Sequence, residues 1–387
     1  MALANLNLNL EQTAELVTHV GPKRTVLVEG HMGTGKSSLL GIIANNLNAK
    51  KQETDEATSS ETETEAPKKS GVKYTAFYCD CTTKDVGDIM LPVIHEVDQS
   101  GKFVRFVTNE ELGAHTNKPV VIMLDEFGKC NRAVQNALRR LMLERKIGAY
   151  TLHEDSIVFA TTNLGAENVG DVMEAHKRNA IISVRMKKPT AEDWIVNFGF
   201  LNDLHPAVLG FAKEYPQIMD SFEDVSPEDN PYIFHPKEVR AAFVTPRSLH
   251  TASDILKTCE GVVDKFTLQA ALMGAIGPRA GADLMAFVTM VGQLHSIDDI
   301  KRNPEGLDVP SSSAAIIMTV SKVLGAMDSQ LINPWMKFLR RLPKEAQAMF
   351  ARSALKDSYK HNRIVTRSEE FSTWVRDNAS LFMSDRR

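Results

Sequence analysis

The chain has 387 residues, of which 43% are hydrophobic and 24% are charged, and its formal net charge is −4. This length is enough for roughly two or three domains with cores of ordinary size. A negative net charge argues against a protein whose whole surface is built to bind nucleic acid, although a local basic patch remains possible.

Two further features concern the cellular compartment. The N-terminus lacks the basic start and long apolar core of a secretory signal, and no run of about eighteen apolar residues is present to span a bilayer. The four cysteines, at positions 79, 81, 130 and 259, include no second pair at a zinc-binding spacing. We therefore expect a cytoplasmic protein with reduced thiols and no membrane contact.

The first strong pattern follows a short helix predicted over residues 11–20. An apolar run leads into the sequence Gly-His-Met-Gly-Thr-Gly-Lys-Ser at residues 30–37, and a helical pattern begins at Ser38. This order is typical of a buried strand, a phosphate-binding loop and a helix. A glycine-rich loop alone could be a flexible turn, but the flanking strand and helix favour a nucleotide site.

The residue types of this loop suit a triphosphate. Glycines let successive backbone N–H groups converge on phosphate oxygens at a helix N-terminus, where the helix dipole favours negative charge. Lys36 would neutralise the β- and γ-phosphates, and the Ser37 hydroxyl would bind Mg²⁺. The predicted nucleotide-binding residues of the loop are Gly30, His31, Met32, Gly33, Thr34, Gly35, Lys36, Ser37 and Ser38.

The next segments are less regular. Residues 50–70 are rich in Glu, Thr, Ser and Lys and lack aromatic residues, so we expect a disordered insertion, whether linker or regulatory element. A second strand is predicted over residues 74–79. Residues 83–92 resemble a turn-rich loop, and residues 99–107 contain a glycine turn followed by alternating apolar residues.

A third strand is predicted over residues 120–124, where five apolar residues fit burial on both faces. It ends in Asp125 and Glu126, which places two carboxylates at the edge of the sheet where open α/β folds bind ligands. Asp125 would hold Mg²⁺, and Glu126 would polarise the attacking water. Carboxylates at strand ends also serve as helix caps, but their position downstream of a phosphate loop favours the catalytic interpretation.

The rest of the α/β pattern comprises a helix at residues 131–146, a short hairpin at 146–152 and a fourth strand that ends at Asn163. Asn163 could cap a turn, or it could position the attacking water or contact the γ-phosphate. A fifth strand is predicted over residues 180–186. After Pro189 the periodicity is predominantly helical, apart from an acidic loop.

The predicted architecture is thus an α/β P-loop core with a five-stranded parallel sheet, followed by an all-α region. We expect four segments: a leader helix at residues 1–20, the core at 21–189, a helical lid at 190–296 and a helical extension at 297–387. From Lys337 onward there are twelve Lys or Arg and six Asp or Glu, a net charge of about +6. This basic end is either a solvated face of a helical bundle or a site for an anionic partner.

In their order, these motifs resemble the AAA+ ATPases, and within them the MoxR-like and dynein-related branch, over about residues 20–295. Residues 30–37 are similar to Walker A, Leu124-Asp-Glu126 to Walker B, and Thr161-Thr-Asn163 to sensor 1. The resemblance also assigns Arg178 to the position of the arginine finger and Arg247, in Thr-Pro-Arg-Ser, to sensor 2.

The resemblance implies ATP and Mg²⁺ as cofactors and a ring, most often a hexamer, in which Arg178 reaches the nucleotide of the adjacent subunit. Arg247 would sense that nucleotide from the helical domain, and hydrolysis would drive remodelling of a protein partner. Relatives often act as chaperones that mature partner complexes or insert metal into them, commonly with a von Willebrand factor A-type protein, and occur in bacteria and their phages.

This chain departs from the family pattern at three places. His31 and Met32 stand where relatives often carry proline, and the insertion at residues 50–70 is long. Residues 84–91, where relatives can carry a substrate-facing loop, contain no aromatic residue, which argues against a threading mechanism by analogy with unfoldases.

Two alternatives stay open at this level. A nucleic-acid motor or loader would use the basic C-terminal region and its interleaved aromatic residues, although their spacing also suits an amphipathic core. A nucleotide-gated assembly protein would bind ATP but hardly hydrolyse it, against which Glu126 argues. The aromatic residues in question are Trp335, Phe338, Phe350, Tyr359 and Trp374.

Overall fold

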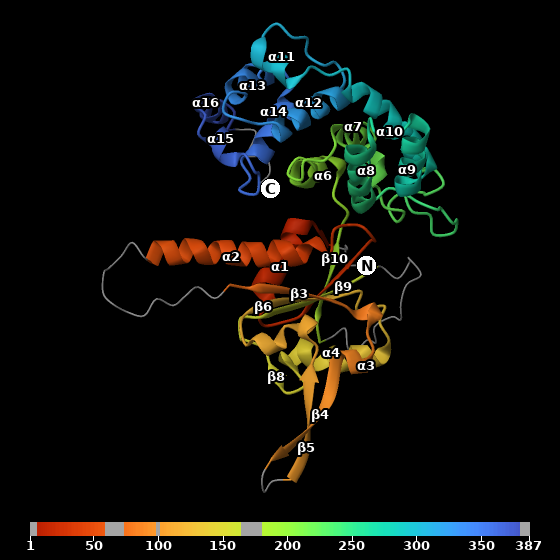
Figure 1. The fold of residues 1–387 in the computed structure, drawn as a ribbon, viewed down its shortest axis with the longest axis vertical. Coiled ribbons are helices and arrows are strands. Elements are labelled where there is room, and N and C mark those ends of the chain that lie inside the picture. Colours follow the sequence, from red (N-terminus) through yellow and green to blue (C-terminus); the bar gives the residue numbers. More distant parts are fainter. Residues whose placement is uncertain (1–5, 59–72, 98–100, 164–179, 380–387) are drawn as a thin grey trace. The chain divides into compact units, whose positions relative to one another are not determined.

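The computed structural model describes residues 6–58, 73–97, 101–163 and 180–379. The chain divides into two compact units, Met1–Lys188 and Pro189–Arg387, and each is described here by itself (Figure 1). The first unit is an α/β domain and the second is helical, which confirms the predicted fold class.

The first unit is built on a parallel sheet of six strands in the order β1-β10-β2-β9-β6-β3. All five predicted strands are present, and a sixth, β1, was not predicted. It contains only Asn7 and Leu8, which pair with Arg185 and Met186 of β10 and are too few to show an alternating pattern. The strands are β1 (Asn7–Leu8), β2 (Val26–Gly30), β3 (Thr75–Asp80), β6 (Val120–Asp125), β9 (Ile157–Thr162) and β10 (Ile182–Met186).

The two faces of this sheet are covered by different helices. Val121 and Met123 of β6 pack on the face covered by α1 (Leu10–Val20) and α2 (Ser38–Thr58), together with Phe159 of β9. The intervening residues of β6 pack on the other face, with α4 (Arg132–Glu144). Since side chains alternate along a strand, residues 125 and 161 fall on the α2 face, where the phosphate loop leads into its helix.

Helix α2 differs from the sequence-based expectation because it continues to Thr58, into the segment predicted to be disordered. Residues 50–57 are mostly Lys, Gln, Glu, Asp and Ala, several of which favour the helical state, so a helix already started at Ser38 can extend through them. The remainder of that insertion, residues 59–70, lies outside the described residues.

A long hairpin lies between β3 and β6 in the sequence. Its strands are β4 (Met90–Val97) and β5 (Gly101–Thr108), which pair antiparallel and extend away from the sheet (Figure 1). The prediction of a loop over residues 83–92 was therefore wrong from residue 86 onward, where α3 (Val86–Ile89) and β4 form. Strand β4 escaped recognition because it is apolar on both faces and contains Pro92, which only an edge strand tolerates.

The short hairpin predicted at residues 146–152 is confirmed as β7 (Lys146–Ile147) and β8 (Tyr150–Thr151). It holds the base of the long hairpin, since the Ala149 N–H donates to the Phe106 carbonyl oxygen at 3.0 Å. The Arg105 guanidinium also lies over the Tyr150 ring, 5.9 Å from its centre. Three 3₁₀ turns complete the described part of this unit: η1 (Cys81–Thr83), η2 (Glu110–Leu112) and η3 (Ala114–Thr116).

The second unit is helical throughout its described regular elements. Among the described residues of the whole chain, none of the helices combines the length and apolar character needed to cross a membrane. The elements are α6 (Ala191–Trp194), η5 (Ile195–Gly199), α7 (Pro206–Glu214), η6 (Pro216–Met219), α8 (Pro246–Cys259), α9 (Lys265–Ile276), α10 (Pro278–Val291), α11 (Ile297–Arg302), α12 (Ser313–Gly325), α13 (Ile332–Leu339), α14 (Lys344–Ala354), α15 (Asn362–Thr366) and α16 (Glu369–Asp377).

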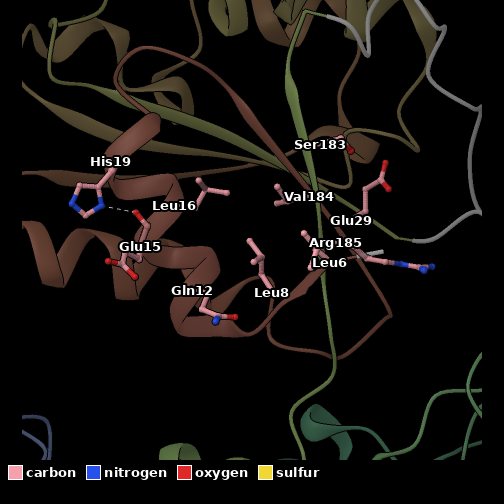
Figure 2. Close-up of a pocket in the computed structure, with 10 residues that line it drawn as sticks. All are labelled: Leu6, Leu8, Gln12, Glu15, Leu16, His19, Glu29, Ser183, Val184 and Arg185. Carbon is pink, nitrogen blue, oxygen red and sulfur yellow. Dashed lines mark hydrogen bonds between the residues drawn. The ribbon is translucent and has the colours of Figure 1, made fainter. Parts of the chain in front are cut away.

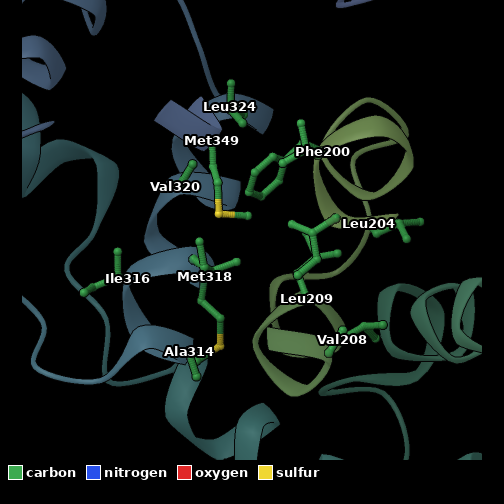
Figure 3. Packing of buried hydrophobic residues seen from close by; sticks show 14 of the residues in the cluster. Phe200, Leu204, Val208, Leu209, Ala314, Ile316, Met318, Val320, Leu324 and Met349 are labelled. Atoms are coloured by element: carbon green, nitrogen blue, oxygen red, sulfur yellow. The ribbon is translucent and has the colours of Figure 1, made fainter. Parts of the chain in front are cut away.

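One hydrophobic core runs through this unit, from Ala191 to Trp374, and crosses the predicted segment boundary between residues 296 and 297. Figure 3 shows Met318 of α12 and Leu209 of α7 in this packing. The five C-terminal aromatic side chains considered above for base stacking are all at most 3% exposed. They are core residues, so they are not available to stack on bases, as the hypothesis of a nucleic-acid motor or loader required.

Candidate functional site

The phosphate loop joins the end of β2 to the start of α2, as the sequence predicts. Gly33 and Gly35 have φ angles of 71° and 96°, which side chains larger than hydrogen rarely allow. Gly30 is favoured for another reason, because a Cβ atom there would lie 3.0 Å from the Met186 carbonyl oxygen on the adjacent strand β10, a tight contact. The glycine spacing of the loop therefore has a backbone cause.

The remaining side chains of the loop differ in exposure. His31 and Thr34 are buried, and the Thr34 hydroxyl donates to the His31 carbonyl oxygen at 2.9 Å. Met32 is half-buried, whereas Ser37 and Ser38 are exposed at the point where α2 begins. The two serine hydroxyls are thus accessible from solvent at a helix N-terminus.

Lys36 connects this loop to the end of β9. Its ammonium group donates to the carbonyl oxygens of Gly30 at 2.6 Å and His31 at 2.7 Å, and to Asn163 Oδ1 at 2.8 Å. Lys36 is 7% exposed, and a buried ammonium group is costly unless polar atoms surround it. The structure therefore brings together the predicted Walker A lysine and the predicted sensor 1 amide.

Asp125 lies at the end of β6 and is 8% exposed. The Thr161 hydroxyl donates to Oδ1, and the Tyr78 hydroxyl donates to Oδ2 at 2.9 Å. The Glu126 N–H also donates to Oδ1, at 3.1 Å. Burial raises the pKa of Tyr78 above its ordinary value, and the hydrogen bond to Asp125 raises it further. Hydrogen-bond donors on both oxygens fix the orientation of the Asp125 carboxylate.

Glu126 occupies a turn directly after β6, with a φ of 51°. Its N–H lies 3.3 Å from Thr161 Oγ1, and the Phe127 N–H donates to the Thr161 carbonyl oxygen at 2.9 Å, which ties the turn to β9. The close packing continues at Gly128, where a Cβ atom would lie 2.3 Å from Thr162 Oγ1. This turn holds the second carboxylate in a left-handed conformation that is uncommon for glutamate.

The two carboxylate oxygens of Glu126 have different surroundings. Oε1 lies 3.0 Å from the ammonium nitrogen of Lys129. Oε2 is buried and has no hydrogen-bond partner within the part of the chain that the structure describes. A buried acceptor without a partner requires an explanation, and a position that a reacting water occupies is one.

These residues converge because β2, β9 and β6 are neighbours in the sheet and all run in the same direction. Their C-terminal ends therefore meet at one edge. A glycine-rich loop and an ammonium group fit phosphate oxygens, and a buried carboxylate with oriented oxygens fits Mg²⁺, which prefers oxygen ligands. The donor set present thus fits Mg²⁺ and a nucleoside triphosphate, with Ser37 and Asp125 as the residues suited to the metal.

Two further predicted site residues lie outside the described part of the first unit. Arg178 lies outside the described residues. Arg247 lies in the first turn of α8, in the second unit, where the Thr245 hydroxyl accepts from the Ser248 N–H and caps the helix. The contribution of each arginine to nucleotide binding stays a prediction.

Three residues of the site had no role assigned from the sequence, namely Thr161, which was named only as part of the sensor 1 motif, Tyr78 and Lys129. Strand alternation could have indicated Thr161, since it is two residues beyond the buried Phe159. Tyr78 and Lys129 show no such signal, because a tyrosine on an edge strand and a lysine in a turn are common and their partners are set by the fold.

A cavity of about 920 Å³ lies beside α1, β1 and β10 (Figure 2). Lys36, Asp125, Glu126 and Asn163 are absent from its lining. The cavity is therefore distinct from the cluster that these four residues form, which we call the strand-end cluster. Its lining residues are Leu6, Leu8, Gln12, Glu15, Leu16, His19, Glu29, Ser183, Val184 and Arg185.

Comparisons with known proteins bear on the first unit. Residues 26–184 match the family described as "ATPase family associated with various cellular activities (AAA)". This range contains every described residue of the strand-end cluster. No curated protein matches the chain.

Three solved structures are similar to parts of the chain. PCH-2 from C. elegans is 12% identical over 71% of this chain and 68% of its own, with a TM-score of 0.32. NtrX from Brucella abortus, crystallised with ADP, is 13% identical over 98% of this chain and 69% of its own, with a TM-score of 0.35. An MCM homologue from Methanopyrus kandleri is 13% identical over 72% of this chain and 53% of its own, with a TM-score of 0.27. At these scores the likenesses carry no argument about function.

Proposed function

We propose, from the premise that residues 26–184 form an AAA ATPase domain, that this protein hydrolyses ATP in a Mg²⁺-dependent reaction. The observation that carries the proposal is the meeting of four groups at the ends of three adjacent strands: the Lys36 ammonium, the Asn163 amide, the Asp125 carboxylate and the unpartnered Glu126 Oε2. An assembly protein that only binds ATP would not need the last of these.

Each group has a distinct task in this proposal. Lys36 exchanges carbonyl oxygens for phosphate oxygens when the nucleotide binds, which frees Asn163 Oδ1 to orient the attacking water. Glu126 accepts a proton from that water through Oε2. Ser37 and Asp125 hold Mg²⁺, which when bound offsets negative charge on the phosphates.

The hydrolase is proposed to belong to the MoxR-like branch and to act as a ring, which in AAA+ proteins is most often a hexamer. Arg178 of one subunit would reach the nucleotide of its neighbour, and Arg247 would contact the nucleotide from the helical unit. A guanidinium group stabilises charge on the transferred phosphoryl group and can be supplied by an adjacent chain. What supports this step is the sequence resemblance.

The work of the ring is proposed to be the remodelling of a protein partner, and the long hairpin supports this. Six of the fourteen exposed large hydrophobic side chains of the described residues lie on this one hairpin. Such a concentration marks a surface that contacts another protein. The six are Leu91, Val93, Ile94, Phe103, Val104 and Phe106. Residues 84–91 lack an aromatic residue, but β5, paired with β4, supplies two.

The hairpin suits a protein better than a nucleic acid. Lys102 forms an ion pair with Glu96, and the Arg105 guanidinium lies over the Tyr150 ring, so both cations are already engaged within this unit. A nucleic-acid motor remains the second candidate through the basic C-terminal region alone. The resemblance suggests a von Willebrand factor A-type protein as the partner class.

The hairpin can be tested with the cross-strand pair Ile94 and Val104, which are 69% and 54% exposed. We expect Ile94→Ser with Val104→Ser to lower recovery of the partner by at least tenfold, because burial of each side chain contributes about 1.5–3 kcal/mol. The measurement is the amount of partner retained from the source-organism lysate by ATP-bound protein made inactive by Glu126→Gln.

Phe266→Ser is the matched control, since Phe266 is 82% exposed and lies on α9 of the second unit. It should leave recovery unchanged. Equal recovery with the hairpin variant would contradict the assignment of the hairpin. DNA-stimulated hydrolysis that weakens steeply with salt would favour the nucleic-acid candidate.

A further inference from the structure

The edge strand β3 presents a tyrosine to the strand-end cluster. Tyr78 is opposite Met123 in the register of β3 and β6, and both lie two residues before the strand ends. Paired residues of parallel strands share a face, so Tyr78 is on the same face as Met123 and Asp125. Asp125 lies two residues beyond the paired position, a distance of roughly 7 Å along the strand. A tyrosine side chain spans that distance, and its hydroxyl donates to Asp125 Oδ2 at 2.9 Å.

The residue directly opposite Asp125 in the register is Asp80, but Asp80 is engaged elsewhere. Its Oδ1 accepts from the Thr82 N–H at 2.9 Å and from the Thr82 hydroxyl at 2.7 Å, which caps the turn η1. Strand β3 therefore supplies a hydrogen-bond donor to Asp125 through Tyr78, while its own carboxylate, Asp80, is tied to the turn.

Tyr78 is not part of the hydrophobic core. The residue is 47% exposed, and β3 is the last strand of the sheet. The neighbouring Cys79, by contrast, is buried in the cluster that packs on the α4 face. The part of Tyr78 with a specific partner is the hydroxyl, and that partner is the carboxylate best suited to Mg²⁺.

We propose that Tyr78 is a positioning residue for the metal: its hydroxyl, together with that of Thr161, holds the Asp125 carboxylate in the orientation that binds Mg²⁺. Oδ1 accepts from both the Thr161 hydroxyl and the Glu126 N–H, whereas Tyr78 supplies the hydrogen bond to Oδ2, so loss of the Tyr78 hydroxyl lets the carboxylate rotate. Hydrogen-bond partners of metal-binding groups of this kind typically contribute about 10- to 100-fold to metal affinity. This inference rests on the proposed ATPase site.

The test is the affinity for Mn²⁺, a paramagnetic substitute for Mg²⁺, measured by electron paramagnetic resonance in the presence of saturating ATP. The Glu126→Gln background prevents turnover during the titration. We expect Tyr78→Phe, which removes only the hydroxyl, to weaken Mn²⁺ binding by about tenfold. In the active protein the Mg²⁺ concentration for half-maximal rate should rise by a similar factor, with little change in kcat at saturating metal.

Tyr232→Phe is the matched control, because the Tyr232 hydroxyl donates to the Asp283 carboxylate at 2.8 Å in the second unit. It removes the same type of hydrogen bond and should leave Mn²⁺ affinity unchanged. Unchanged affinity in Tyr78→Phe, with normal binding in the parent protein, would overturn the role of Tyr78 alone. Absence of ATP-dependent Mn²⁺ binding in the parent protein would instead overturn the proposed function.

Discussion

The Glu126→Gln variant is expected to bind ATP and to release phosphate about 100- to 10,000-fold more slowly than the parent protein, the range typical for loss of a general base. Glutamine keeps the size of the side chain but cannot accept a proton from water at neutral pH. The residue lies in a left-handed turn, and its Oε2 is buried without a hydrogen-bond partner among the described residues.

Two measurements check this result, namely the steady-state rate of phosphate release and the fraction of bound nucleotide that stays ATP. Glu144→Gln is the control, since Glu144 is exposed at the end of α4 and pairs with Arg140 at 3.3 Å. A rate in Glu126→Gln within a few-fold of the parent protein would remove Glu126 from the reaction. The ion pair with Lys129 would then be its sole role.

Substitution of Lys36 has the second large expected effect, a loss of ATP affinity on the order of 100-fold or more. Charge-assisted hydrogen bonds contribute about 1.5–3 kcal/mol each, and Lys36 can offer several of them to phosphate oxygens. A difference of about 2.7 kcal/mol already corresponds to 100-fold. Fluorescent-nucleotide titration of Lys36→Ala measures the loss directly.

Lys36→Ala also leaves the carbonyl oxygens of Gly30 and His31 and the amide of Asn163 without this donor, so the loop could rearrange. Lys36→Met removes the same donor but keeps most of the side-chain packing; it should lose affinity to a similar extent, and its thermal midpoint reports how far the loop is destabilised. Lys146→Ala, at an exposed position on β7, is the control. Retained ATP affinity in both Lys36 variants would contradict the phosphate-loop assignment.

Much of the site follows from local pattern. The glycine spacing of the phosphate loop predicts backbone conformations with positive φ, which the structure shows at Gly33 and Gly35. Five apolar residues before Asp125 indicate a strand buried on both faces. The residues that follow such a strand lie at the C-terminal edge of the sheet. These features are predictable because each depends on neighbouring residues of the chain.

Other features depend on which strands pair with one another, and strand pairing cannot be derived from the local sequence pattern. The two residues of β1 become a strand only through β10, and Tyr78 reaches Asp125 only through the register of β3 with β6. The long hairpin was missed because β4 is apolar on both faces, a pattern that an isolated hairpin in water does not require. A hairpin that contacts a partner, as proposed above, can be apolar on both faces and then lacks the alternation on which strand prediction relies.

The most direct test of the whole account is the mass of Glu126→Gln protein in solution, measured by sedimentation with and without ATP and Mg²⁺. We expect a nucleotide-dependent shift from a smaller species to a closed oligomer, because the proposed site is completed by Arg178 of a neighbouring subunit. A monomer under both conditions would contradict the ring and the role of Arg178, although the strand-end site itself would stand.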